Sequence, residues 1–274
     1  MRGAGYDEGK DFTIEARYGD GRGEALAQLA AELVKLKVDV IVATGTPAAR
    51  AAQRATSTIP IVMPVSADPI GDGFAASLAR PGANVTGLSA MSPDLADKYF
   101  EMLGALIPKL RQVAVLANPA NDSHAAQVWR MRQAADKAGA RVSTAEGGTP
   151  DGLAAAFAAM GSQGVDACII LPDTFFVQQV AQLARLAAQR RLPSIYLTRE
   201  YPEAGGLMSF GPDINDNFRR SADYVDRILK GALPGELPIE QPAKFDLVVN
   251  LKTAKALGIR IPPPVLVRAD RVIE

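Results

Sequence analysis

The sequence predicts an α/β protein with two parallel sheets, each with helices on both faces. Strand-like runs alternate with segments of helical period along the whole chain of 274 residues. The run at 38–45 is almost continuously apolar, as expected for a strand buried on both faces. About ten strands are too many for one strongly twisted open sheet, so two sheets and two lobes are expected.

The expected elements follow from periodicity. Strands are expected at 11–18, 38–45, 59–67, 85–89, 112–118, 140–146, 166–173, 192–198, 206–211 and 244–250. Helices, with apolar residues at three- and four-residue spacing, are expected at 24–37, 93–107, 124–139, 151–161, 177–191 and 218–231. A further helix should begin at Thr46-Pro47, where the strand 38–45 ends.

Turn-rich stretches divide the chain into two Rossmann-like lobes joined by three crossovers. The first passage is expected between Ser89 and Asp94, the second near Gly205-Gly206 and Pro212, and the third in the Pro-rich stretch 233–245. Lobe 1 then holds residues 1–89 and 209–240, and lobe 2 holds residues 90–208 and 241–274. Such lobes form a clamshell with its cleft at the carboxyl ends of the strands.

Composition argues against several classes of partner. Thirty basic residues balance thirty acidic ones, and no basic run with interleaved aromatics indicates nucleic-acid binding. No apolar stretch approaches the roughly 20 residues that span a bilayer, so insertion of this chain in a membrane is not expected. The single cysteine, Cys168, lies in an apolar run and is expected to be buried and inert.

The strand end at Thr44-Gly45-Thr46 is the first candidate ligand contact. Thr46 can cap the following helix, and free N–H groups at a helix start attract carboxylates and other anions. After the next strand come Ser66 and Asp68. Asp68 could neutralise a ligand ammonium, although Asp-Pro is equally a turn signal.

Lobe 2 offers Asn118, Asp173, Tyr196, Thr198 and Arg199 at or after its strand ends. Asn118 and Asp173 could instead cap the helices that follow. Arg199 could bind a ligand carboxylate or form a surface ion pair, for which the adjacent Glu200 is available. Tyr196 could stack on a flat ligand, as could Phe175 and Phe176, although such aromatics usually pack in the core.

Catalytic signals are weak, and we expect neither an enzyme nor a cofactor. His124 is the only histidine, so no histidine pair can hold a metal, and its position at a helix start predicts an exposed or capping role. The stretch 71–77 contains a Gly-x-Gly turn but lacks the Lys-Ser/Thr of a phosphate-binding loop. Trp129 is expected to pack against the protein rather than to recognise a ligand.

Several segments together resemble a known family. The run RPGANVTG at 80–87, the tail NLKTAKALGIRIP at 250–262 and RADRVIE after it are the most specific; VIVATGTP at 40–47 adds to them. They are similar to ABC-transporter substrate-binding proteins of the family that includes tryptophan and tyrosine uptake proteins. The resemblance implies a type I periplasmic-binding-protein-like fold, a periplasmic or other extracytoplasmic location, and delivery of a small solute to a membrane permease.

One departure from that family concerns the start of the chain. In the family a signal sequence, a first strand and a first helix precede a Gly-Tyr-x-Glu-Gly turn, and here that turn is Gly5 to Gly9. The resemblance therefore implies that a strand central to the first sheet is absent. We expect a chain without it to be less stable, to bind ligand more weakly and to associate through exposed strand edges.

The favoured function is a binding protein that closes on a small amino-acid-like or aromatic carboxylate solute and does not transform it. The alternative is a cytoplasmic small-molecule sensor or an enzyme on the same fold, because a fold does not fix a function.

Overall fold

The computed structural model describes residues 5–90 and 95–274, and they form two compact units. Unit 1 comprises Met1–Met91 and Ile214–Pro242, and unit 2 comprises Ser92–Asp213 and Ala243–Glu274. The chain therefore passes three times from one unit to the other. Part of the expected first passage, residues 91–94, lies outside the described residues, as does the expected start of the helix at 93–107.

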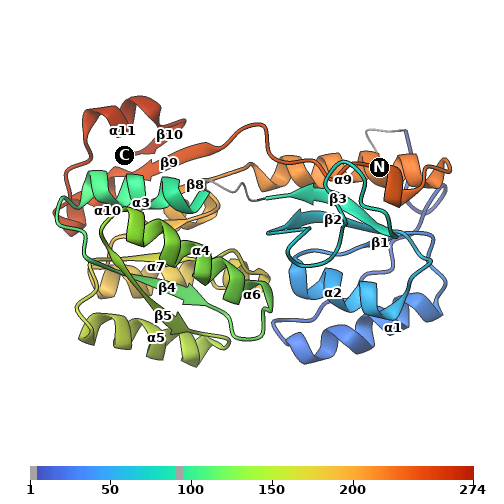
Figure 1. The fold of residues 1–274 in the computed structure, drawn as a ribbon, viewed down its shortest axis with the longest axis horizontal. Coiled ribbons are helices and arrows are strands. Elements are labelled where there is room, and N and C mark those ends of the chain that lie inside the picture. Colours follow the sequence, from blue (N-terminus) through green and yellow to red (C-terminus); the bar gives the residue numbers. More distant parts are fainter. Residues whose placement is uncertain (1–4, 91–94) are drawn as a thin grey trace. The chain divides into compact units, whose positions relative to one another are not determined.

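Unit 1 is built on a three-stranded parallel sheet in the order β1-β2-β3 (Figure 1). Its elements are the 3-10 turn η2 (Gly23–Ala25), α1 (Leu26–Lys35), β1 (Ile41–Val42), α2 (Thr46–Ala55), β2 (Ile61–Ser66), β3 (Val85–Ser89), α9 (Ile214–Leu229) and η3 (Pro234–Glu236). Helices α1 and α2 lie on one face of this sheet and α9 lies on the other (Figure 1).

Successive side chains of β2 point to opposite faces of the unit 1 sheet and pack in two different apolar clusters. Ile61 and Met63 pack in the cluster below α1 and α2, whereas Val62 packs with Tyr224 and Ile228 of α9. All three β2 side chains are fully buried. The nearly continuous apolar run of β2 thus reflects a sheet with both faces covered. For residues 38–45 the same expectation is wrong, because the strand there is only Ile41–Val42 and Val42 is 49% exposed.

Unit 2 holds a seven-stranded sheet in the order β10-β9-β8-β7-β6-β4-β5, parallel except for the antiparallel pair β8 and β9. Its strands are β4 (Gln112–Ala117), β5 (Arg141–Glu146), β6 (Ala167–Ile170), β7 (Ser194–Tyr196), β8 (Met208–Gly211), β9 (Asp246–Asn250) and β10 (Arg271–Ile273). Its helices are α3 (Leu95–Leu106), α4 (Ser123–Lys137), α5 (Pro150–Ser162), α6 (Thr174–Gln178), α7 (Val180–Gln189), α8 (Glu200–Glu203), α10 (Leu251–Leu257) and α11 (Pro263–Arg268).

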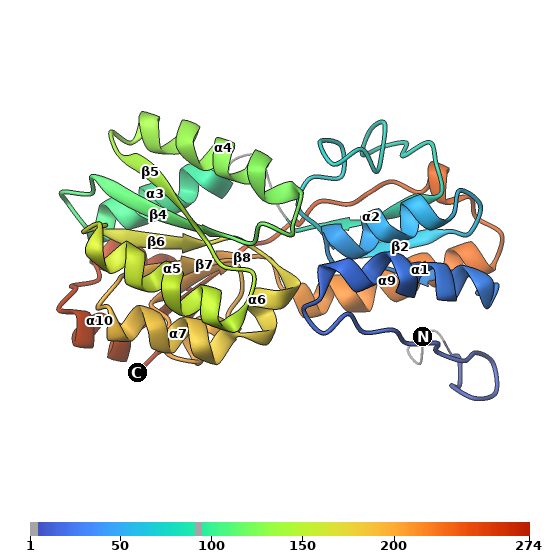
Figure 2. The same ribbon diagram turned by 90° about the horizontal axis from the view of Figure 1, so that it is seen from below.

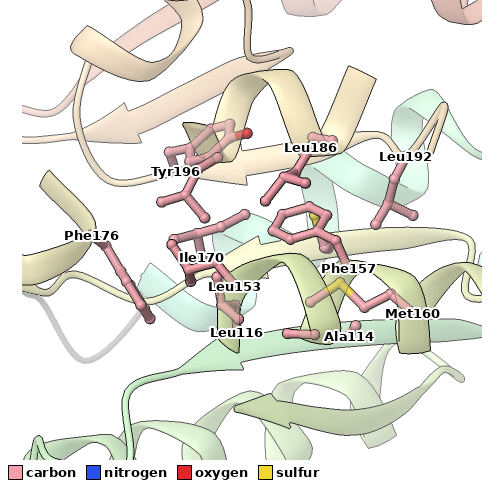
Figure 3. Packing of buried hydrophobic residues seen from close by; sticks show 14 of the residues in the cluster. Ala114, Leu116, Leu153, Phe157, Met160, Ile170, Phe176, Leu186, Leu192 and Tyr196 are labelled. Carbon is pink, nitrogen blue, oxygen red and sulfur yellow. The ribbon is translucent and has the colours of Figure 1, made fainter. Parts of the chain in front are cut away.

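Helices α3 and α4 cover one face of the unit 2 sheet, and α5 and α7 cover the other (Figure 2). The core beneath α5 and α7 is shown in Figure 3, where Phe157 of α5 packs against Leu186 and Leu192. Phe157 and Tyr196 are fully buried. The predicted fold class, two parallel-dominated sheets with helices on both faces, is confirmed.

Two further predictions of local structure are wrong, and short elements such as β10 and α8 were not predicted. Residues 11–18 form no strand: Ile14 and Tyr18 are 64% and 75% exposed, and the alternating pattern finds no neighbouring strand in the described structure. The expected helix at 177–191 is two helices, α6 and α7, because the backbone leaves helical geometry at Gln179. The short strand β10 was not expected, because three residues carry too little periodicity.

Buried and exposed residues also differ from expectation at two sites on α4. Trp129 is 60% exposed rather than packed, and His124 is 3% exposed rather than on the surface. Helical spacing explains both: Val128 and Met131 face the core, and Trp129 points away from that stripe. Cys168 is fully buried in mid-strand, as expected, and burial raises the pKa of its thiol, so it is unreactive.

Strand β1 is an edge strand of the unit 1 sheet, and its exposed side could pair with another copy of the protein. Strand β1 pairs with β2 on one side only within the described structure, and Val42 is 49% exposed. Unpaired edges with apolar side chains favour association between copies. We expect Val42→Lys to lower the associated fraction at high protein concentration, measured by size-exclusion chromatography with light scattering.

The matched control is Val177→Lys, which changes a valine of similar exposure, 52%, on α6 of unit 2. It should leave association unchanged. An equal effect of both substitutions would show that added charge, and not the β1 edge, controls association.

Candidate functional site

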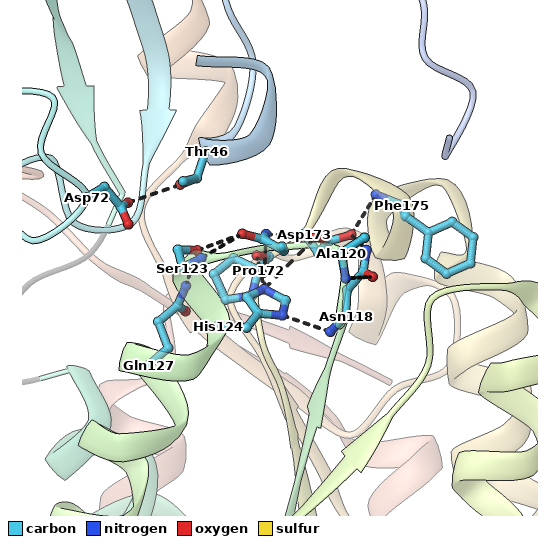
Figure 4. A network of polar contacts seen from close by, with 11 residues as sticks. Thr46, Asp72, Asn118, Ala120, Ser123, His124, Gln127, Pro172, Asp173 and Phe175 are labelled. Atoms are coloured by element: carbon cyan, nitrogen blue, oxygen red, sulfur yellow. Dashed lines mark hydrogen bonds and ion pairs between the residues drawn. The ribbon is translucent and has the colours of Figure 1, made fainter. Parts of the chain in front are cut away.

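Three of the five sequence candidates of unit 1 lie at the turn between β1 and α2: Thr44, Gly45 and Thr46. Gly45 is the residue before the helix, and its φ of 83° favours glycine. Thr46 is therefore the first residue of the helix, and the prediction that Thr46 caps the helix is wrong. Thr44 is exposed and Thr46 is buried. The Thr46 hydroxyl lies 3.3 Å from the Asp72 carboxylate, to which it donates a hydrogen bond (Figure 4).

Asp72 is a residue that the sequence analysis missed, since it lies in the stretch interpreted only as a glycine turn. Burial raises the pKa of its carboxyl, an effect that Arg50 opposes and the nearby Asp68 reinforces. Arg50 lies 3.7 Å from the Asp72 carboxylate, donates to the Asp72 carbonyl at 2.6 Å, and stacks over the ring of Phe74. The start of α2 therefore carries a carboxylate of the protein itself, balanced by an arginine.

The other two candidates of unit 1 have local partners. The Asp68 carboxylate accepts from the Gly71 N–H at 2.9 Å, which supports the turn alternative. Ser66 is fully buried at the end of β2; its carbonyl accepts from the Ser89 hydroxyl at 3.3 Å, while its own hydroxyl lacks a hydrogen-bond partner in the described structure. A buried hydroxyl in that state can serve a ligand or a water molecule.

In unit 2 two candidates meet at neighbouring strand ends. β4 pairs with β6 in parallel register, so Asn118 and Asp173 leave the sheet side by side. The Asn118 side-chain amide donates to Asp173 Oδ1 at 3.1 Å, and the Phe175 N–H donates to the same oxygen at 2.9 Å. Asp173 therefore caps α6, the alternative open from the sequence, while also joining a wider network.

That network includes three residues that the sequence analysis did not choose: Asn121, Ser123 and His124. Ser123 and His124 are labelled in Figure 4. Asn121 donates to Asp173 Oδ2 at 2.8 Å and accepts from the Ser123 hydroxyl at 2.8 Å. The polar run Asn-Asp-Ser-His after β4 was a usable signal for them. All three side chains are buried, and the network places five polar residues at the ends of two strands.

The carboxylate of Asp173 has no positively charged partner among the described residues of this network. His124 Nε2 lies 3.9 Å from Asp173 Oδ2, and burial lowers the pKa of the ring below its usual 6.5 despite that neighbour. The imidazole is therefore uncharged at neutral pH and does not balance the carboxylate. Asp173 is held by neutral amide donors, an arrangement that attracts a cationic group.

The remaining candidates of unit 2 lie elsewhere. Tyr196 is fully buried, with its ring stacked on Tyr201 at a centroid distance of 4.4 Å, which supports a packing role. Phe175 and Phe176 are buried in the same core cluster. Arg199 lies 3.7 Å from Asp213 and Thr198 is partly buried; no described contact joins either to Asn118 or Asp173.

No group of three or more His, Cys, Asp or Glu residues in the described ranges could hold a metal ion. Among the same residues, no helix combines the length and apolarity needed to cross a membrane.

Comparisons with known proteins agree with this architecture. The family model for ABC transporter substrate binding proteins matches residues 1–273. A tyrosine-binding protein of Clostridioides difficile is 26% identical over 256 residues, which are 93% of this chain and 73% of that protein.

Two crystal structures are similar over nearly the whole chain. A conserved domain protein from Vibrio cholerae has a TM-score of 0.93 and 31% identity, covering 99% of this chain and 90% of its own. The ABC domain from Streptococcus pneumoniae in complex with L-Trp has a TM-score of 0.91 and 29% identity, covering 99% and 91%. The match over residues 1–273 shows that this chain belongs to the ABC transporter substrate-binding protein family, and the similar structures and the sheet topology show that it has the type I periplasmic binding fold.

Proposed function

We propose that this protein binds an amino-acid-like solute outside the cytoplasm, closes on it and delivers it to a membrane permease without transforming it. The observation that carries the choice of solute is Asp173, a buried carboxylate at a strand end whose partners are neutral amides. The proposal does not require a cofactor or a bound metal.

The strand-end cluster of unit 2 suits the ammonium of an amino acid. Asp173 has three N–H donors, which leaves acceptor capacity on a carboxylate that can take about four. A buried negative charge is weakly screened, so it favours a ligand ammonium.

The ligands named for similar proteins support this class. One relative is described as tyrosine-binding, and another was crystallised with L-Trp. A simple aromatic carboxylate is the other solute class expected from the sequence. It lacks the ammonium group that would pair with the Asp173 carboxylate. We therefore favour an amino acid over a deaminated acid.

The remaining candidates Thr44, Gly45, Thr46, Ser66, Asp68, Asn118, Thr198 and Arg199 stay proposed ligand contacts. Tyr196 is the weakest of the original candidates, because its ring is enclosed by the core. Extracytoplasmic location and the permease partner rest on family membership.

A thermal-shift screen tests the proposed solute class. Tyrosine, tryptophan and aliphatic amino acids are compared with tyramine and with 3-(4-hydroxyphenyl)propionate, which lack one charge each. We expect the melting temperature to rise most with an intact amino acid, and calorimetry to confirm the binding. Mass analysis should recover the solute unchanged; a chemically altered solute would instead favour the enzyme alternative.

Asp173→Asn separates the charge from the shape of the site. We expect affinity for the amino acid to fall about tenfold or more, because the ammonium loses its charged partner, while binding of the deaminated acid changes little. The control is Asp151→Asn, an exposed acid in the first turn of α5. A loss of affinity equal for both solutes would contradict an ammonium near Asp173.

Closure of the units is tested by small-angle scattering. The three passages of chain are the basis for proposing that the units move together when a solute binds. We expect the radius of gyration to decrease with a confirmed ligand. A constant radius at saturating ligand would refute the closure.

A further inference from the structure

His124 occupies a buried position between two strand ends. Its ring lies at the start of α4, where it meets Asn118 after β4 and Pro172 after β6 (Figure 4). It is the single histidine among 274 residues. Any histidine titration of this protein therefore reports on this one place.

The contacts of the ring fix its tautomer. The Asn118 backbone N–H points at Nδ1 from 2.8 Å, and a backbone N–H can only donate, so Nδ1 must be the acceptor. The proton of the neutral ring then sits on Nε2, which donates to the Pro172 carbonyl at 3.1 Å. The Asn121 amide nitrogen, 3.2 Å from Nε2, is a neighbouring donor that bonds Asp173 instead.

These two hydrogen bonds tie the segments that carry the proposed ligand contacts. One holds the backbone of Asn118, whose side chain bonds Asp173, and the other holds the residue that precedes Asp173. We propose that His124 is a positioning residue, whose neutral Nε2–H tautomer holds the ends of β4 and β6 for solute binding and whose protonation releases them. This inference rests on the proposed function, because it concerns the same site.

The geometry of these two hydrogen bonds opposes protonation of the His124 ring. A second ring proton on Nδ1 would face the Asn118 N–H across 2.8 Å, which replaces a hydrogen bond with a repulsion between two donors. Burial lowers the pKa of the ring in the same direction. The charged group that faces it is Asp173 of the α6 start, at 3.9 Å, which favours protonation less strongly than burial disfavours it.

The aromatic groups near His124 or Asp173 do not supply a charge. Phe176 lies 6.2 Å from the imidazole centroid. Tyr201 of α8 lies within the field of Asp173, and burial raises the pKa of its hydroxyl, so it is neutral wherever the histidine titrates. Protonation of the ring thus changes the charge of this network by one unit.

The free energy of unfolding should also depend on the protonation of His124. Because the folded-state pKa of His124 lies below the unfolded value near 6.5, the unfolded chain binds more protons as the pH falls through that value. The contribution to the free energy of unfolding is therefore fully present above about pH 6.5 and is lost as the pH falls toward the folded-state pKa.

Nuclear magnetic resonance of the whole chain tests the two hydrogen bonds of His124 without any ligand. The ring nitrogen shifts of the single histidine should show the Nε2–H tautomer at pH 7.5, and its titration gives the pKa, which should lie below that of a free histidine. The Nδ1–H tautomer, or a pKa above the free value, would overturn the proposal.

Binding tests the positioning role. The ligand from the thermal-shift screen, tyrosine in the first instance, is titrated calorimetrically from pH 5 to 8. Below the measured pKa of the ring, affinity should fall by about tenfold per pH unit, as for any ligand that binds one protonation state only. An affinity that stays flat through the titration of the ring would overturn the positioning role.

Variants at pH 7.5 separate positioning from folding. His124→Phe keeps a planar ring but removes both hydrogen bonds; we expect about tenfold weaker binding and faster hydrogen exchange at the Asn118 amide. His124→Gln, which can still accept and donate, should recover part of the affinity. Gln133→Ala, on the exposed side of α4, is the control for folding and should bind like the wild type.

The outcomes distinguish this inference from the proposed function. Equal affinity of wild type and His124→Phe would overturn the role of His124 while leaving solute binding intact. A wild-type protein that binds none of the solutes at any pH would overturn the proposed function and, with it, the role of His124 in binding. If His124→Phe does not fold, the tautomer and the pH profile of the wild type decide.

Discussion

The parallel register of β4 and β6 is the constraint on which the unit 2 site depends. Val113 pairs with Ala167 and Leu116 with Ile170, so the two strands end at the same level. Asn118 and Asp173, 55 residues apart in sequence, then lie within 3.1 Å of each other. A shift of the register by one residue would turn the buried apolar side chains of β6 to the other face and separate these two polar groups. Apart from Gln112 at the start of β4, both strands are buried, so the register that buries them also assembles the site.

The two units hold a buried carboxylate in different ways. In unit 1, Arg50 lies beside Asp72, so the charges balance locally. In unit 2, amide groups and a backbone N–H solvate Asp173 in place of water, and the histidine beside it is neutral. A buried charge that is hydrogen-bonded but not neutralised is costly to the fold and attractive to a cation. That difference is the physical basis for assigning the ammonium preference to unit 2.

The rule that ligand groups follow the carboxyl ends of parallel strands chose both Asn118 and Asp173, because strand ends can be recognised in the sequence, and the structure places the two side by side. It could not find the hydrogen bonds of His124, whose partners come from the ends of two different strands. The same rule chose Tyr196, yet that ring packs on Tyr201, a contact set by a helix that the sequence did not predict. Position along a strand predicts where a residue lies; the direction of its side chain depends on what packs there.

The sequence by itself determined the alternation of strands and helices, the two parallel sheets, the burial of Cys168 and the family resemblance, since periodicity and local motifs are properties of neighbouring residues. Only the tertiary structure decided that residues 11–18 form no strand, that Trp129 is exposed and that Asp72 accepts a hydrogen bond from Thr46. It also decided the tautomer of His124. Each of these depends on contacts between segments far apart in the chain, and such contacts are fixed by packing and hydrogen-bond satisfaction over the whole sheet, which no local pattern records.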